Sequence, residues 1–401
     1  MKNLVYIQSG GPTSVINSSL YGAIKEAKKH PTLIGHIYGS RYGIEGLIDD
    51  NLIDLGLEDD EQIELLLQTP GSILGTTRKK LPKDIHTVEY TKIIDTIKKH
   101  NIGYVLINGG NDSMDTCHKI ATLVEELGIN DVKVIGVPKT IDNDLACTDH
   151  SLGFPSAAKY VMNAVNAFSV DAGCFKKGKV HVVEIMGRSA GWLTAAVDLL
   201  PPETRPHLIY IPEIPFDLEQ FLVDVKKVYA EKGFALVAIS EGLQFERDMS
   251  NVRVDGFGHV QLGGAASELC RIIESRLDLP TRAIEFSIVQ RAFPSFVSLI
   301  DRKEAINTGK KAVQAALKGI TGKMITFERV SQNPYKIKYL LAPLDKVANA
   351  VSHVTPDMIV DNTRMSDKFR DYLRPLVVGE VKLVYKDGLA PVTVLKHHKV
   401  K

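Results

Sequence analysis

Cysteine is scarce in this chain of 401 residues, and its four cysteines, at positions 117, 147, 174 and 270, form no C-x-x-C pair. This spacing excludes a disulfide-rich scaffold and gives no zinc-binding pattern. No apolar run is long enough to cross a bilayer, and the run near the N-terminus is too short for a signal peptide. We therefore expect a cytoplasmic protein that has no membrane partner.

The chain also lacks an excess of charge of either sign. Its 49 lysines and arginines against 48 aspartates and glutamates leave a formal net charge of +1. Such a balance provides no long-range attraction to nucleic acid or to an anionic membrane, so we expect neither as a partner. Any anion must therefore be bound by a local cluster of side chains.

What the chain does contain is a regular alternation of short β-branched runs and helical patterns. Strands are predicted at residues 4–7, 104–107, 181–185, 207–211, 235–239 and 284–289. Strands that alternate with helices indicate parallel sheets covered on both faces, and such folds bind ligands beyond the carboxyl ends of their strands. We predict an α/β fold with two Rossmann-like three-layer α/β/α domains, mainly parallel sheets and a C-terminal α+β extension.

The order of the elements predicts where the chain passes between the domains. Residues 1–150 form the first domain, and residues 301–365 rejoin it through a long helix that begins near residue 303. Residues 151–300 form the second domain, to which part of the tail at 366–401 can also belong.

The most informative segment is Gly-Val-Pro-Lys-Thr-Ile-Asp-Asn-Asp at residues 136–144, which follows an apolar run. Asp142 and Asp144 are two residues apart, so in an extended segment they point to the same side. Two carboxylates beside Lys139 suit phosphoryl transfer: one accepts a proton from the attacking hydroxyl, the other holds Mg²⁺, and the lysine neutralises phosphate charge. The alternative is an Asx-rich turn that caps a helix or faces water.

Four further turns carry glycine or arginine. Gly10 and Gly11 follow one predicted strand, and residues 109–113 follow another. Glycine lets backbone N–H groups approach an anion, and a helix N-terminus adds a favourable dipole. Arg78 and Arg188 suit bidentate phosphate contacts. The glycine turns are also compatible with packing alone, Asp112 or Ser113 with a helix N-cap, and each arginine alone is more typical of a surface ion pair. Together the four turns favour a phosphate site.

Taken together, these residues resemble the phosphofructokinase family. The matching segments follow the family's order over about three quarters of the chain: Ser-Gly-Gly at 9–11, Gly-Thr-Thr-Arg at 75–78, Gly-Gly-Asn-Asp-Ser at 109–113, Pro-Lys-Thr-Ile-Asp-Asn-Asp at 138–144, Met-Gly-Arg at 186–188, Ser-Glu-Gly at 240–242 and Gln-Arg at 290–291. The resemblance implies the phosphofructokinase fold and phosphoryl transfer to the 1-hydroxyl of fructose 6-phosphate. It also implies a homodimer or homotetramer with the sugar site at a subunit interface.

The resemblance assigns roles residue by residue. The catalytic set is implied to be Asp142 as general base with Thr140, Asp144, Lys139 and Arg188. The donor contacts are implied to be Gly11, Arg78, Asp112 and Lys139, and the Mg²⁺ ligands Asn111, Asp112 and Asp144. The sugar phosphate is implied to contact Thr140, Asp142, Lys179, Met186, Gly187, Arg188, Glu241, Arg291 and Arg302. Residues 1–150 are thus expected to bind the donor and residues 151–300 the sugar phosphate, with Lys179 acting across a subunit interface.

Positions 112 and 139 bear on the identity of the donor. The ATP-using branch of the family has glycine at both, whereas this chain has Asp112 and Lys139, like the pyrophosphate-dependent members. A carboxylate repels the α-phosphate of a nucleotide, and a lysine offsets the charge of a small anion. The resemblance therefore implies reversible transfer from pyrophosphate, which forms fructose 1,6-bisphosphate and phosphate. The alternative is an ATP-dependent 6-phosphofructokinase in which Asp112 caps a helix and Lys139 lies on the surface.

Two departures from the family pattern leave further alternatives open. Asn111 stands where most members have a magnesium-binding aspartate, and a neutral amide is a weaker ligand. Either Asp112 then takes more of the metal's charge or the substrate holds the ion, and a catalytically weak, sugar-phosphate-binding regulatory subunit is a third hypothesis. The segment after Arg291 also departs from the pattern, so the role of Arg302 stays open. Sedoheptulose 7-phosphate is for the same reason an alternative, additional acceptor.

Overall fold

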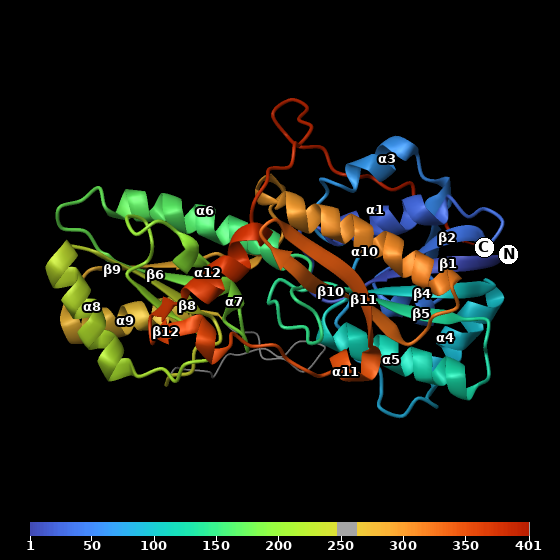
Figure 1. Cartoon of the computed structure of the whole chain (residues 1–401), viewed down its shortest axis with the longest axis horizontal. Coiled ribbons are helices and arrows are strands. Elements are labelled where there is room, and N and C mark those ends of the chain that lie inside the picture. Colours follow the sequence, from blue (N-terminus) through green and yellow to red (C-terminus); the bar gives the residue numbers. More distant parts are fainter. Residues whose placement is uncertain (247–262, 401) are drawn as a thin grey trace.

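The computed structural model describes residues 1–246 and 263–400 and shows an α/β protein built around two main sheets (Figure 1). Helices flank the strands of each sheet, which gives the three-layer arrangement that the alternating sequence pattern predicts. Within the described part of the chain, no helix is long and apolar enough to cross a membrane. All four cysteines are free, and Cys117 and Cys270 are buried.

The first sheet has seven strands in the order β11-β10-β5-β4-β1-β2-β3. The strands from β10 to β2 run parallel, and β11 and β3 pair antiparallel at the two edges. The strand order reverses between β1 and β4, and such a switch point opens a ligand-binding crevice beyond the carboxyl ends of the strands. The strands are β1 (Lys2–Gln8), β2 (Ile34–Ser40), β3 (Leu52–Asp54), β4 (Ile102–Gly109), β5 (Lys133–Pro138), β10 (Lys323–Gln332) and β11 (Tyr335–Pro343).

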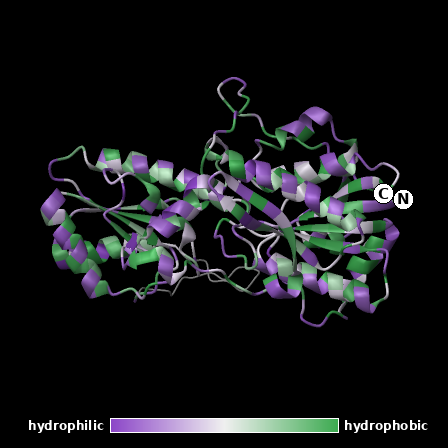
Figure 2. Ribbon diagram, in the orientation of Figure 1, coloured by the Kyte–Doolittle hydropathy of each residue, from purple (hydrophilic) through white to green (hydrophobic). Residues whose placement is uncertain are grey.

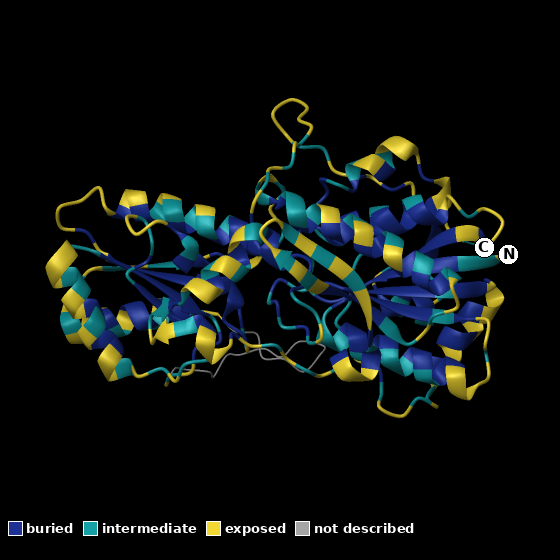
Figure 3. Ribbon diagram, in the orientation of Figure 1, coloured by how far each residue is buried: buried dark blue, intermediate teal, exposed yellow. Residues whose placement is uncertain are grey.

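Both faces of this sheet are buried. Val5 and Ile7 of β1 enter one hydrophobic core, and Leu4 and Tyr6 enter another on the opposite face. Two-sided burial explains why the strand reads as one continuous apolar run. Figure 2 shows the central strands as hydrophobic, and Figure 3 shows them buried under helices whose outer faces are exposed. The covering helices are α1 (Ile16–Ala27), α2 (Ile44–Ile48), α3 (Asp60–Leu65), α4 (Val88–Lys99), α5 (Asn111–Glu126), α10 (Leu299–Leu317) and α11 (Leu344–Val347).

The second sheet has four parallel strands in the order β7-β8-β6-β9. Its strands are β6 (Val180–Ile185), β7 (Leu208–Tyr210), β8 (Ala235–Ser240) and β9 (Thr281–Glu285). One face packs against α6 (Phe154–Ala172), α7 (Trp192–Ala195) and α12 (Asp367–Leu373). The other face packs against α8 (Leu218–Lys232) and α9 (Ala265–Leu277).

The C-terminal part of the chain contacts both sheets in turn. Strands β10 and β11 extend the first sheet, after which residues 354–377 pack on the core of the second. This stretch includes the small antiparallel pair β12 (Ile359–Asp361) and β13 (Arg364–Met365). The tail then returns to the first sheet, where the backbone N–H of Asp54 donates to the carbonyl of His398 at 2.8 Å. The last 80 residues therefore hold the two sheet regions together.

One predicted strand is wrong in its bounds. The prediction placed it at residues 284–289, but β9 ends at Glu285 and a 3₁₀ helix follows at Ser287–Arg291. Ser287 has φ of +47°, Ile288 and Val289 are exposed, and the polar Gln290 is buried. The apolar pair therefore belongs to a surface turn. The remaining 3₁₀ helices lie at Leu55–Leu57, Ala196–Leu199, Pro294–Phe296, Pro356–Met358 and Arg374–Leu376.

Candidate active site

A pocket of about 360 Å³ lies where strands of both sheets end. Its walls follow directly on the carboxyl ends of β1, β4 and β5 in the first sheet and of β6 and β8 in the second. Every predicted site residue except Lys179, Gly187 and Arg302 lines it. The lining residues are Gly10, Gly11, Pro12, Arg78, Gly110, Asn111, Asp112, Ser113, Lys139, Thr140, Ile141, Asp142, Asp144, Met186, Arg188, Ser189, Ala190, Glu241, Arg291, Asn349 and Val351.

Lys139 forms part of the pocket wall, yet only 3% of its surface is exposed. Its Nζ donates to the carbonyl oxygens of Ser9 at 2.8 Å and Gly11 at 2.6 Å, so the lysine holds the turn after β1 in place. Burial, together with the positive charges of Arg291 and Arg78, lowers the pKa of Lys139 to about 7, although Asp142 and Asp144 oppose this shift. The reading of Lys139 as a surface residue is therefore wrong.

Asp142 is accessible from the pocket but surrounded by protein atoms. Burial, together with the negative charges of Asp144 and Glu241, raises the pKa of its carboxyl to about 7, although Arg188 and Lys139 oppose this shift. Its backbone N–H donates to Thr140 Oγ1 at 3.1 Å, which fixes the turn. A carboxylate that titrates near neutral pH is suited to accept a proton from an attacking hydroxyl.

Asn111 and Asp144 line the same pocket, and each has one side-chain oxygen without a hydrogen-bond partner among the described residues. Asn111 is the first residue of α5, and its Nδ2 donates to Asp144 Oδ2 at 3.1 Å. The other oxygens, Asn111 Oδ1 and Asp144 Oδ1, are buried and have no hydrogen-bond partner among the described residues. Burial also raises the pKa of Asp144. Neutral and charged oxygens placed in this way suit a hard cation such as Mg²⁺.

Protein side chains alone do not complete a metal site here. Among residues 1–246 and 263–400, no group of three or more His, Cys, Asp and Glu side chains is arranged to hold a metal ion. Asp112 lines the pocket, and its Oδ1 lies 3.6 Å from Lys80 Nζ. The N-cap of α5 is Gly110, so neither Asp112 nor Ser113 occupies the capping position. A metal ion would therefore take part of its coordination shell from a bound substrate and water.

The second sheet provides the opposite wall. Met186 and Arg188 follow β6, and the backbone N–H of Met186 donates to the buried Gln290 Oε1 at 3.0 Å, which places the neighbouring Arg291 at the pocket. Gly187 does not line the pocket but has φ of +143°, and a Cβ there would lie 2.6 Å from a backbone carbonyl oxygen. Only glycine fits this turn.

Two predicted residues lie away from the pocket of their own chain. Lys179 is exposed and precedes β6, so it lies at the amino end of the strand whose carboxyl end carries Arg188. Arg302 lies in the first turn of α10, where burial lowers the pKa of its guanidinium.

The structure also adds residues that the sequence analysis missed. Asn349 and Val351 line the pocket from the segment between α11 and β12, far along the chain from every motif. The segment is fixed there because the Ser352 N–H donates to the carbonyl of Asp144 at 2.8 Å. No local pattern in the sequence marks these residues, since only the return of the C-terminal segment brings them to the site.

Comparison with known proteins gives consistent matches over most of the chain. A family model described as Phosphofructokinase matches residues 3–316. The pyrophosphate–fructose 6-phosphate 1-phosphotransferase of Halomonas elongata is 38% identical, and the match covers 99% of this chain and 97% of that protein. The sulfofructose kinase of Alkalicoccus urumqiensis is 33% identical, with 89% and 91% covered. The crystal structure of a pyrophosphate-dependent phosphofructokinase from Marinobacter aquaeolei superposes with a TM-score of 0.91 at 37% identity and covers 100% of this chain and 98% of that one.

Proposed function

The chain belongs to the phosphofructokinase family, and from this premise we propose that it transfers a phosphoryl group from pyrophosphate to the 1-hydroxyl of fructose 6-phosphate. The products are fructose 1,6-bisphosphate and phosphate. The reaction is reversible, because the free energies of reactants and products lie closer together when pyrophosphate, and not ATP, is the donor. The enzyme therefore serves both glycolysis and gluconeogenesis.

The observation that carries the choice of donor is the buried Lys139 at the pocket. A buried cation attracts a small polyanion strongly because little water screens it. Asp112 on the same side of the pocket disfavours the longer phosphate chain of a nucleotide. A volume of about 360 Å³ is near the lower end of ligand pockets, which span about 300–1,000 Å³, and it has to hold donor and acceptor together. This also favours pyrophosphate.

The proposal gives each side of the pocket one task. Gly11, Arg78 and the turns after β1, β4 and β5 bind the donor, and the segments after β6 and β8 bind the sugar phosphate. Asp142 accepts the proton of the 1-hydroxyl, supported by the pKa of about 7 that burial and its acidic neighbours give it. Arg188 and Lys139 balance the negative charge that gathers around the transferring group. The sugar-phosphate contacts we propose are Thr140, Met186, Glu241 and Arg291, which line the pocket, with Gly187 and Arg302 remaining predictions.

We propose Mg²⁺ as the metal, held by Asn111 and Asp144 with Asp112 close by. The support is the pair of buried oxygens without partners, Asn111 Oδ1 and Asp144 Oδ1. Mg²⁺ keeps several ligands from water and substrate phosphates, so two protein oxygens fit its usual coordination. When bound, it neutralises charge on the pyrophosphate oxygens.

We further propose that the protein works as a homodimer or homotetramer in the cytoplasm. Lys179 is exposed at the end of β6 opposite the pocket, which suits a contact with the sugar phosphate of a neighbouring subunit rather than its own. Four free cysteines suit a reducing compartment.

The test is fructose 1,6-bisphosphate formation by the purified chain with Mg²⁺ and either pyrophosphate or ATP. We expect activity with pyrophosphate and no measurable rate with ATP. Activity with ATP alone would refute the donor, and no activity with either would favour a regulatory, sugar-phosphate-binding role. Because the segment after Arg291 departs from the family pattern, the same assay is run with sedoheptulose 7-phosphate as a second acceptor.

A further inference from the structure

Asn143 lies between the two pocket aspartates, and both polar atoms of its side-chain amide are hydrogen-bonded. Asn143 is 3% exposed and adopts φ of +56°, a left-handed conformation that directs Asp142 and Asp144 into the pocket. Its Oδ1 accepts the backbone N–H of Ser151 at 2.8 Å, and its Nδ2 donates to Tyr372 Oη at 2.9 Å. The direction of the two carboxylates therefore depends on the partners of one amide.

Tyr372 provides one of these partners from α12, more than 200 residues along the chain. Its hydroxyl donates to the backbone carbonyl of Asp149 at 2.9 Å, so it accepts from Asn143 and donates back to the same loop. The ring lies 4.7 Å from the guanidinium of Arg329 and 5.3 Å from the ring of Trp192. These contacts leave the hydroxyl little freedom to move.

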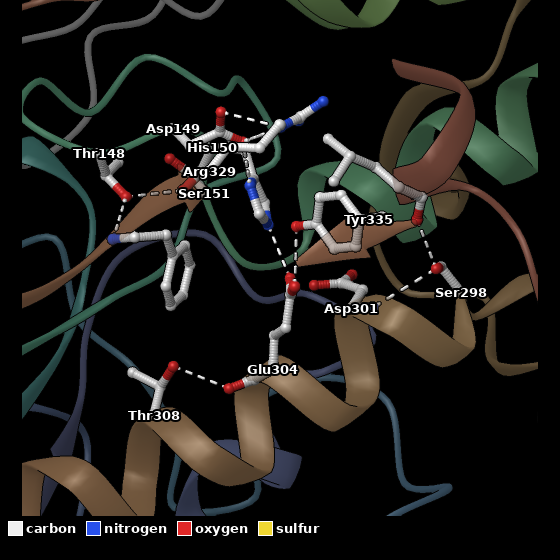
Figure 4. Close-up of polar contacts among 12 residues, drawn as sticks. Thr148, Asp149, His150, Ser151, Ser298, Asp301, Glu304, Thr308, Arg329 and Tyr335 are labelled. Atoms are coloured by element: carbon white, nitrogen blue, oxygen red, sulfur yellow. Dashed lines mark hydrogen bonds and ion pairs between the residues drawn. The ribbon is translucent and has the colours of Figure 1, made fainter. Parts of the chain in front are cut away.

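The anchor beneath Tyr372 is a buried ionic cluster, shown in Figure 4. Arg329 Nη2 donates to Asp149 Oδ1 at 2.8 Å, and His150 lies between Asp149 at 2.8 Å and Glu304 of α10 at 2.7 Å. Tyr335 Oη donates to the other oxygen of Glu304 at 2.8 Å. The loop that carries the aspartates is thus fastened to α10 and β10 as well as to α12.

A second contact from the C-terminal region acts on the same loop. The N–H of Ser352 donates to the carbonyl of Asp144 at 2.8 Å, and Val351 forms an antiparallel bridge with Leu145. Trp192 of α7 fixes this segment by donating its Nε1–H to the carbonyl of Ser352 at 3.1 Å. The C-terminal region therefore contacts the loop at Asn143 and again at Asp144 and Leu145.

We propose that Tyr372 is a positioning residue for the phosphoryl transfer: through Asn143 its hydroxyl fixes the direction of Asp142 and Asp144. The inference rests on the proposed function, because it presumes that these carboxylates act on the substrates. It assigns a catalytic task to the segment beyond residue 316, which the family model does not match. Loss of the hydroxyl lets the loop turn and misplaces the base without removing any group that binds substrate.

The test compares Tyr372→Phe with Tyr335→Phe, a matched control. Each substitution removes one partly buried hydroxyl bonded to the cluster, but only Tyr372 contacts Asn143. We expect Tyr372→Phe to lower kcat about ten- to a hundredfold while KM for both substrates changes less than about twofold, since a small misplacement costs this much. Tyr335→Phe should lower Tm and leave kcat unchanged.

A third variant, Asn143→Gly, tests whether Tyr372 acts through Asn143. Glycine accepts the positive φ, so the loop can still form. We expect the double variant Asn143→Gly/Tyr372→Phe to lose no more kcat than the worse of the two single variants, because both changes break the same hydrogen bond between Asn143 and Tyr372. Unchanged kcat in Tyr372→Phe, equal kcat losses in both tyrosine variants, or additive losses in the double variant would overturn the inference. An inactive wild-type chain would overturn the proposed function itself.

Discussion

Replacing Lys139 by methionine removes a buried cation that contacts the turn after β1. The lysine is 3% exposed, and its Nζ donates to the carbonyls of Ser9 and Gly11. Methionine has a similar length but no charge. If this ammonium attracts the donor, the substitution weakens pyrophosphate binding by an amount that depends on pH.

The size of the effect follows from the burial and the pKa. At an effective dielectric constant of about 20, two unit charges about 4 Å apart attract each other by about 4 kcal/mol. At pH 6, which lies below its pKa of about 7, Lys139 is mostly protonated. The substitution then weakens pyrophosphate binding by about a thousandfold in Kd. At pH 8 protonating the lysine costs about 1.4 kcal/mol, so the loss falls to about a hundredfold.

Isothermal titration calorimetry in the presence of Mg²⁺ measures the Kd of pyrophosphate for the wild-type chain and for Lys139→Met from pH 6 to 8.5. Because both proteins carry Asp142, the titration of Asp142 largely cancels in the ratio of their two Kd values. Lys80→Met is the matched control: Lys80 is exposed and 3.6 Å from Asp112, and its removal should change Kd only a few-fold. A ratio below about tenfold at pH 6, or one that does not fall as pH rises, would refute the assigned role of Lys139.

Three further predictions test other parts of the account. Asp142→Asn should lower kcat about 10²- to 10⁴-fold with little change in KM for fructose 6-phosphate in a coupled assay; a loss below tenfold would exclude it as the base. Asn111→Asp should lower the Mg²⁺ concentration that gives half-maximal rate, because a carboxylate is a stronger ligand than an amide; an unchanged Mg²⁺ titration would place the metal elsewhere. His150→Gln should lower Tm strongly at pH 6, because the buried Glu304 loses its cation and Asp149 keeps only Arg329. Burial alone would lower the pKa of His150, but Glu304 and Asp149 raise it to about 9, above the ordinary value of 6.5. Its stabilising contribution is therefore full below about pH 6.5 and is lost as pH rises toward 9, so the Tm difference should shrink over that range, and a constant difference would contradict this.

Those parts of the site that lie in single loops could be predicted from the sequence. The segment at 136–144 begins in the last residues of the buried strand β5 and continues into a loop, and the turns at 9–11 and 109–113 each lie between a strand and a helix. Parallel strands bring such turns to one edge of a sheet. Local sequence therefore contains both the residue types and their rough positions, and the pocket unites them.

Other parts depend on contacts between distant segments and could not be predicted. Asn349, Val351 and Tyr372 reach the site only because the chain returns to both sheets after α10. The bounds predicted for the strand at 284–289 were wrong, because the exposed apolar residues at 288 and 289 mimic a buried run, whereas Gln290 is the buried residue. The lowered pKa of Lys139 likewise follows from burial that no motif encodes.

The most direct test of the central claim is ³¹P NMR of the purified chain with Mg²⁺, fructose 1,6-bisphosphate and inorganic phosphate. This experiment observes the donor itself and needs no coupling enzyme. We predict that a pyrophosphate resonance appears as the bisphosphate is converted to fructose 6-phosphate. Loss of the bisphosphate without pyrophosphate, or formation of ATP only when ADP is added, would contradict the account.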